Sequence, residues 1–189
     1  MPLTTLDSNT ALIVVDLQQG IVGLPFPHPI GEVVKRARAL VDAFRQHGLP
    51  VVLVNVAGAA PGRTEQPPRL RQFPEGWTDL IPELNQQPKD ILITKRTWGA
   101  FTNTTLDAQL KASGVTQVVV AGIATGTGVE ATARQAHEHG FNVTLAIDAM
   151  TDARPEAHEY SIAQVFPRIG ETGTTEQIIQ QLENRSVGR

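Results

Sequence analysis

Two charged residues and one glycine-rich turn, each at the end of an apolar run, could together carry out acid–base chemistry. Asp16 ends the run ALIVVD, Lys95 ends the run DILITK, and residues 126–128 read GTG just after VVVAGIAT. An aspartate and a lysine that meet in a desolvated cleft shift each other's pKa and can move protons at neutral pH. A glycine-rich turn that opens a helix offers N–H groups to a carboxylate or a developing oxyanion. An aspartate, a lysine and a glycine-rich turn in these positions therefore predict an acid–base site.

The elements that must position these residues alternate between strands and helices. Strands are predicted by short apolar runs at residues 11–16, 49–56, 90–95, 116–122 and 141–148, with a sixth edge strand within 163–170. Helices are predicted at residues 31–47, after a cap at Asn103, after the glycine turn, from Pro155, and after a Thr174–Gln177 capping box. Apolar strands that alternate with helices imply a doubly wound, mainly parallel six-stranded α/β sheet with helices on both faces. Ligands bind such sheets beyond the carboxyl ends of the strands.

Composition narrows the class of protein. The 189 residues contain 41% hydrophobic and 19% charged residues, and we interpret residues 1–189 as a single domain. A net charge of -3 argues against nucleic-acid binding. The apolar runs are too short to span a membrane, and the first ten residues lack a secretory pattern, which predicts a cytoplasmic location. There is no cysteine, which excludes disulfides, thiolate metal sites and thiol nucleophiles.

One interpretation of the glycine-rich turn is dinucleotide binding. Residues 126–131 match G-x-G-x-x-A, follow a strand and open a helix, and Asp148 lies about twenty residues further on, where a ribose-binding acid is expected. The fingerprint normally follows the first strand of its fold, however, and here it follows the fourth. Nucleotide binding therefore remains an alternative.

Read together, the segments ALIVVDLQQGIV, ITKRTWGAFTNTTLDAQL and VVVAGIATGTGVEATARQAHEHGFNVTLAIDAMTD resemble the isochorismatase-like (cysteine hydrolase) superfamily over nearly the whole chain. By this resemblance, Asp16 and Lys95 match the catalytic aspartate and lysine. The position of the nucleophilic cysteine falls on Gly128. Trp98 and Phe101 match aromatic positions of the pocket wall, although both also suit a hydrophobic core.

The resemblance also implies further features of the site. Substrate binding is expected from the turn residues Ala124, Thr125 and Thr127, and a non-proline cis peptide is expected at Ala124-Thr125. Arg63 either binds a substrate carboxylate or faces water. The metal-binding nicotinamidases use an Asp and two His after the second strand, and residues 51–66 contain neither. We therefore expect no metal and no cofactor.

The absence of a cysteine thiol decides which branch of the superfamily this chain resembles most. The isochorismatases proper, which cleave the vinyl ether of isochorismate, also dispense with it. We therefore expect metal-independent hydrolysis of a small molecule, with Asp16 and Lys95 as the acid–base pair and a water or substrate group in open space beside Gly128. The alternative is a non-catalytic ligand-binding or scaffold member. The family also implies a homo-oligomer, a dimer or tetramer, with residues 57–88 as a candidate contact.

Overall fold

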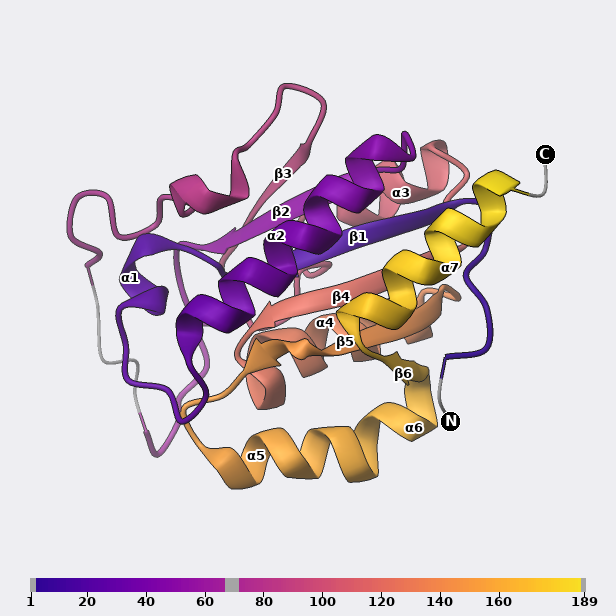
Figure 1. Cartoon of the computed structure of the whole chain (residues 1–189). Coiled ribbons are helices and arrows are strands. Elements are labelled where there is room, and N and C mark those ends of the chain that lie inside the picture. The colour runs from indigo at the N-terminus through magenta and orange to yellow at the C-terminus, as the bar shows by residue number, and fades with distance from the viewer. Residues whose placement is uncertain (1–2, 67–71, 188–189) are drawn as a thin grey trace.

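The computed structural model describes residues 3–66 and 72–187, and its centre is a six-stranded, all-parallel sheet in the order β3-β2-β1-β4-β5-β6 (Figure 1). The strands are β1 (Thr10–Val15), β2 (Val51–Val56), β3 (Ile91–Lys95), β4 (Gln117–Ile123), β5 (Asn142–Thr151) and β6 (Glu171–Gly173). The helices are α1 (Gln19–Val22), α2 (Ile30–Gln46), α3 (Leu106–Ala112), α4 (Glu130–Glu138), α5 (Pro155–Tyr160), α6 (Phe166–Ile169) and α7 (Thr175–Val187). The predicted doubly wound α/β class is confirmed.

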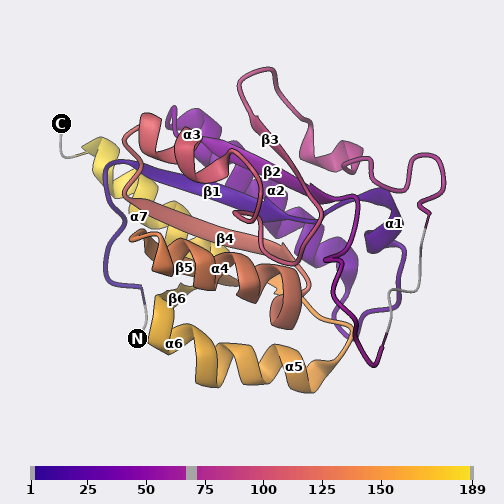
Figure 2. The same ribbon diagram turned by 180° about the vertical axis from the view of Figure 1, so that it is seen from behind.

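Helices cover both faces of this sheet. Helices α2 and α7 lie on one face, and α3 and α4 lie on the other, with α5 and α6 along the β5–β6 side (Figures 1 and 2). Strand β1 alternates between two apolar clusters: Leu12 and Val14 belong to the cluster with α2 and α7, and Ile13 and Val15 to the cluster with α3 and α4. Because both clusters exclude water, every residue of β1 is buried, which explains the apolar run from Ala11 to Val15.

A glycine brings the two central strands together at the edge where the predicted site lies. Gly122 has a φ of +116°, and a Cβ on it would lie 2.0 Å from the carbonyl oxygen of Val15. Only glycine accepts this conformation and this approach. The chain that leaves β4 is therefore held beside the residue that follows β1, which is Asp16.

Three predicted details can be compared directly with the structure. The capping box is confirmed, since the Thr174 N–H donates to the side chain of Gln177 and the Gln177 N–H donates to the Thr174 hydroxyl. The strand predicted within 163–170 is wrong, because residues 163–169 are helical and β6 follows them; Pro167 lies in α6, directly after a π-helical turn over Ser161–Val165. Asn103 has a φ of +55° in a turn, and Thr105 is the residue that precedes α3, so the predicted cap is also wrong.

Part of the region 57–88 packs against the strand ends. The side chain of Gln18 is fully buried and bonds to backbone atoms of Val56 and Trp77, and the Trp77 ring lies over Gly20, where a Cβ would overlap it. Residues 67–71 lie outside the described residues. Within 3–66 and 72–187, no helix combines the length and apolarity that crossing a membrane requires.

Candidate active site

Asp16 and Lys95 meet at the carboxyl edge of the sheet, as predicted. Asp16 directly follows β1 in a left-handed conformation with a φ of +53°, and Lys95 is the last residue of β3. The Lys95 Nζ lies 2.7 Å from the Asp16 Oδ2, and the same ammonium donates to the carbonyl oxygen of Thr97 at 3.2 Å. Strand β2 lies between the two strands, so the lysine stem must cross the end of β2 to reach the carboxylate.

Burial determines the electrostatics of this ion pair. The two residues are 5% and 1% exposed. Burial raises the pKa of Asp16 from 3.8 to about 6, and the Lys95 ammonium offsets only part of that rise. The second oxygen, Oδ1, is buried and has no hydrogen-bond partner among the described residues. Asp16 is therefore a carboxyl group that can give or take a proton near neutral pH through a free oxygen.

Gly128 lies against this carboxylate. A Cβ on Gly128 would lie 3.2 Å from the Asp16 Oδ2, 3.2 Å from the Val15 Cγ1 and 3.3 Å from the Ile123 carbonyl oxygen. These contacts are tight, so the expected open space beside Gly128 is wrong for the Cβ position itself. Glycine instead allows the Asp16 carboxylate to lie close to the turn.

The turn that carries Gly128 is a single π-helical turn, η2 (Thr125–Val129), which leads into α4. A non-proline cis peptide does precede it, but at Ile123–Ala124, one residue earlier than the expected position. Ala124 and Thr127 are half-buried in this turn, and Thr125 is fully buried. The residues that were expected to bind substrate therefore lie in the same short segment as Gly128.

The same turn offers little to a dinucleotide. The N–H of Gly126 donates to the buried Asp152 carboxylate at 2.8 Å, and a Cβ on Gly126 would lie 3.1 Å from the Ala157 Cβ of α5. A pyrophosphate would meet a carboxylate and a helix at this surface. Asp148 is engaged as well, because it accepts bonds from the N–H and hydroxyl of Thr175 and caps α7. These contacts argue against the nucleotide interpretation.

The remaining predicted residues differ in their exposure to solvent. Phe101 is buried in the core, with its ring stacked on His139 at a centroid distance of 5.1 Å and tilted against Phe141. Trp98 is 67% exposed, and Arg63 is also exposed. Within the described part of the chain, no group of three His, Asp or Glu side chains is placed to hold a metal ion.

A family model, the isochorismatase domain, matches residues 10–177. The chain belongs to the isochorismatase family. It is 43% identical over 183 residues to the isochorismatase family protein YecD of Escherichia coli O157:H7, covering 92% of this chain and 96% of the relative. It is 33% identical over 187 residues to the ureidoacrylate amidohydrolase RutB of Stutzerimonas stutzeri, covering 82% and 75%. An isochorismatase family structure from Burkholderia thailandensis superposes with a TM-score of 0.91 at 40% identity, covering 95% of this chain and 98% of that one.

Sequence reasoning missed one residue that links the parts of this isochorismatase family site. The hydroxyl of Thr132 on α4, fully buried, donates to the carbonyl oxygen of Gly128 at 2.7 Å and accepts from the N–H of Ala100 at 3.1 Å. The loop after Lys95 is thereby fixed to the turn of Gly128. The only indication in the sequence is a threonine on the small, otherwise apolar face of a helix.

Proposed function

We propose that this isochorismatase family member is a metal-independent hydrolase that cleaves vinyl ethers of the isochorismate type with an Asp–Lys pair and water. The observation that supports this most is the buried Asp16 carboxyl, which has one oxygen on the Lys95 ammonium at 2.7 Å and the other unpartnered among the described residues. A raised pKa keeps a useful fraction of this carboxyl protonated near neutral pH.

In the proposed reaction, the Asp16 carboxylic acid transfers its proton to the terminal vinyl carbon. The double-bond electrons form the new C–H bond, which leaves an oxocarbenium ion at the ether-bearing carbon. Water adds to that carbon, and the resulting hemiketal releases an alcohol and a ketone while a proton returns to Asp16. Lys95 holds the carboxylate in place throughout and stabilises its charged form.

The absence of cysteine makes the thiol route of the amide-cleaving relatives unavailable to this chain. RutB is named for amide hydrolysis of ureidoacrylate. An acyl-enzyme needs a nucleophile, and Gly128 stands where the family resemblance places the cysteine. The hydroxyl of Thr125 is bonded to a histidine on the side of α5. Direct attack by water on an activated vinyl ether needs only the proton source that the site contains.

The test is turnover of isochorismate by the purified chain, followed as pyruvate release in a lactate dehydrogenase assay. We expect pyruvate in proportion to enzyme, and none above background with Asp16→Asn. Saturable binding of isochorismate without pyruvate would instead identify a non-catalytic ligand-binding member. Release of ammonia from ureidoacrylate without cleavage of isochorismate would contradict the vinyl-ether proposal.

We also propose a homo-oligomer, a dimer or tetramer. The support is a set of large apolar side chains left exposed on this chain: Leu24, Leu92, Trp98 and Tyr160. Leu92 lies on β3, an edge strand of the sheet. Light scattering after size-exclusion chromatography measures the mass directly, and a value near the 20.4 kDa of one chain at micromolar concentration would rule this proposal out.

A further inference from the structure

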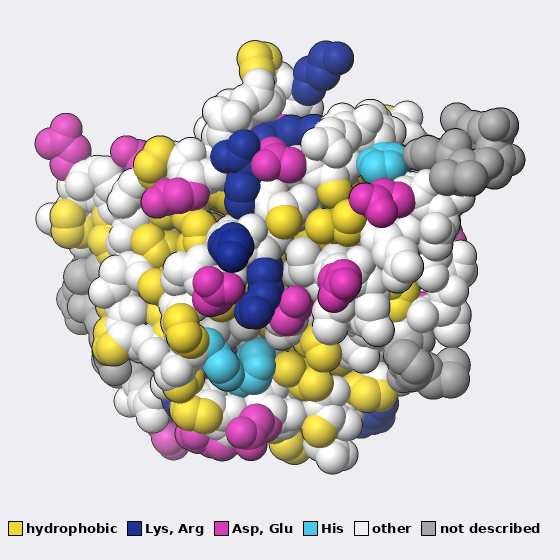
Figure 3. All heavy atoms as spheres, in the orientation of Figure 1, with side chains coloured by type: hydrophobic (Ala, Val, Ile, Leu, Met, Phe, Trp, Pro, Cys, Tyr) yellow, Lys and Arg dark blue, Asp and Glu magenta, His cyan; other side chains and the backbone are white. Residues whose placement is uncertain are grey.

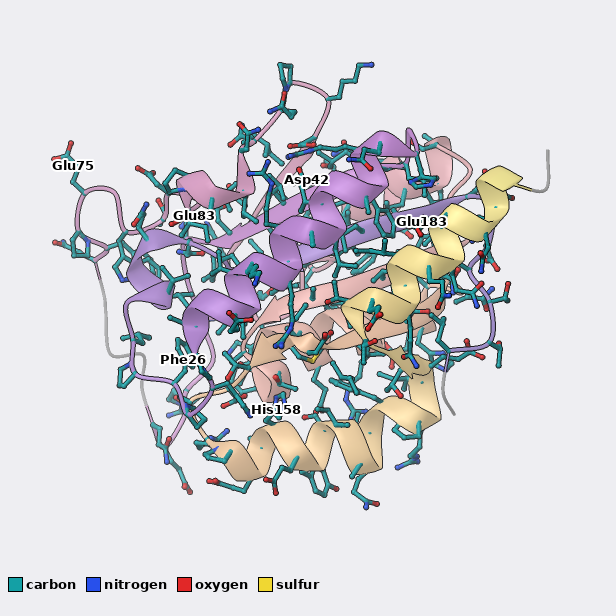
Figure 4. The ribbon with its side chains drawn as sticks, viewed as in Figure 1. Phe26, Asp42, Glu75, Glu83, His158 and Glu183 are labelled. Atoms are coloured by element: carbon teal, nitrogen blue, oxygen red, sulfur yellow. The ribbon has the colours of Figure 1, made fainter. Side chains whose placement is uncertain are left out.

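Two histidines from distant parts of the sequence meet beside the turn of Gly128. His28 comes from the segment between α1 and α2, and His158 comes from α5. Their ring centroids lie 4.6 Å apart. Figure 3 shows histidine side chains side by side on the lower part of this face, with a separate histidine patch at its upper right, and Figure 4 shows His158 between α5 and the sheet.

Each ring is bonded to a buried threonine. The Nδ1 of His158 lies 2.8 Å from the hydroxyl of Thr125, the first residue of the turn, and the Nδ1 of His28 lies 2.8 Å from the hydroxyl of Thr151 at the end of β5. Both threonines are fully buried. A buried hydroxyl without a hydrogen-bond partner costs free energy of folding, and each histidine ring supplies that partner to its threonine.

The neutral form of His158 suits this contact. Burial and the neighbouring His28 lower the pKa of His158 below its ordinary 6.5, and Asp152 and Glu159 oppose that shift. A neutral ring with its proton on Nε2 accepts the hydroxyl proton of Thr125 at Nδ1. Together with the Asp152 carboxylate on the N–H of Gly126, this bond fixes two consecutive residues at the start of the turn.

We propose that His158, packed against His28, is a positioning residue for the reaction: through Thr125 it fixes the turn that holds Gly128 against Asp16. This inference rests on the proposed function for its consequence on turnover, but its effect on the turn is independent of any substrate. Lys95 bonds to Asp16 and Thr97, whereas His158 bonds to Thr125, so His158 acts through the threonine.

Two variants of His158 place the polar atoms of the new side chain at different positions. In His158→Asn, the amide atoms lie where Nδ1 was and can still bond to Thr125. In His158→Gln they lie where Nε2 was. We expect His158→Gln to lower kcat by about 10- to 100-fold with a smaller change in KM, because small misplacements of reacting groups carry costs of this size. His158→Asn should retain most of the parent kcat. His137→Gln, on the exposed side of α4, is the control and should match the parent.

Two further measurements make the inference refutable. Thr125→Val combined with His158→Gln should be no slower than the slower single variant, because both remove one contact; effects that multiply would overturn the inference. Hydrogen exchange at residues 124–129 should accelerate in His158→Gln and not in His158→Asn, and equal exchange in the two variants would also overturn it. Since exchange needs no turnover, a parent that fails to cleave isochorismate refutes the proposed function and leaves this test intact.

Discussion

The Nζ of Lys95 reaches across the end of β2 to lie 2.7 Å from the Oδ2 of Asp16. The contact joins two residues that are almost completely excluded from solvent. One carboxylate oxygen is fixed by the ammonium, and the other is buried without a partner among the residues that the structure describes. The Asp16 carboxylate is therefore held in place through Oδ2, while Oδ1 is available for a contact with substrate.

Asp16→Asn should abolish most of the activity. Asparagine has nearly the shape of aspartate and tolerates the φ of +53° that this position requires, so the fold is preserved while the proton source is removed. We expect kcat/KM for isochorismate to fall by about 10²- to 10⁴-fold. Asp107→Asn is the control, because Asp107 pairs with Lys111 in an ion pair at the surface. A variant Asp16→Asn with half of the parent activity would exclude Asp16 as the acid.

The pH dependence of activity follows from the pKa of Asp16. Proton donation needs the protonated carboxyl, and its pKa is about 6. We therefore expect kcat/KM to fall by about tenfold per pH unit above that value. Initial rates between pH 5 and pH 9 test this, in a buffer of constant ionic strength. A rate that rises across the same interval would show that the site needs a base instead.

The pH dependence of stability has a definite sign. Asp16 has a higher pKa in the folded chain, about 6, than its ordinary 3.8, so the folded state binds this proton more tightly. Its stabilising contribution is complete below pH 3.8 and is lost as the pH rises through about 6, a loss of about 3 kcal/mol. Urea unfolding of the parent and of Asp16→Asn should show this loss as a change in their difference. A constant difference from pH 4 to pH 7 would contradict the raised pKa.

A methyl group at residue 128 should disturb the site. In Gly128→Ala, the new Cβ would lie 3.2 Å from the Asp16 Oδ2 and 3.3 Å from a strand carbonyl that cannot move away. We expect a loss of about 1–3 kcal/mol of stability and a lower kcat. Gly31→Ala in α2 is the matched control, because nothing lies within 4 Å of its Cβ, and it should gain up to about 1 kcal/mol. Unfolding curves and rates for both variants decide the comparison.

The two aromatic residues expected at the pocket wall should respond differently. Phe101→Ala removes a core side chain and should lower the free energy of unfolding by about 3–5 kcal/mol. Trp98→Ala changes an exposed side chain, so stability should move by no more than about 0.5 kcal/mol, while KM rises if the ring contacts substrate. Urea unfolding and steady-state kinetics separate the two effects. An unchanged KM for Trp98→Ala would remove Trp98 from the substrate-binding set.

The sheet and the ion pair could be predicted from the sequence because both depend on local patterns. Apolar runs fixed the strands, and parallel strands bring their carboxyl ends to one edge, so Asp16 and Lys95 had to lie at that edge. The edge strand was misplaced because helix and strand patterns are similar in a short apolar run.

The contacts between distant segments could not be predicted in this way. Nothing in the local sequence around His28 or His158 indicates that their rings meet. The role of Thr132 is equally hidden, because its two partners are backbone atoms of different loops. The contact of His158 depends on how α5 packs against the turn η2, which no periodicity of the sequence encodes.

The left-handed backbone at Asp16 limits how this protein could change during evolution. The residue types that accept that conformation with least strain are glycine, asparagine, aspartate and histidine. A lineage could therefore remove the acid by one substitution, to asparagine or to glycine, and keep its fold. Glutamate or cysteine could not replace the acid at similar cost, because their side chains strain the left-handed backbone that residue 16 adopts.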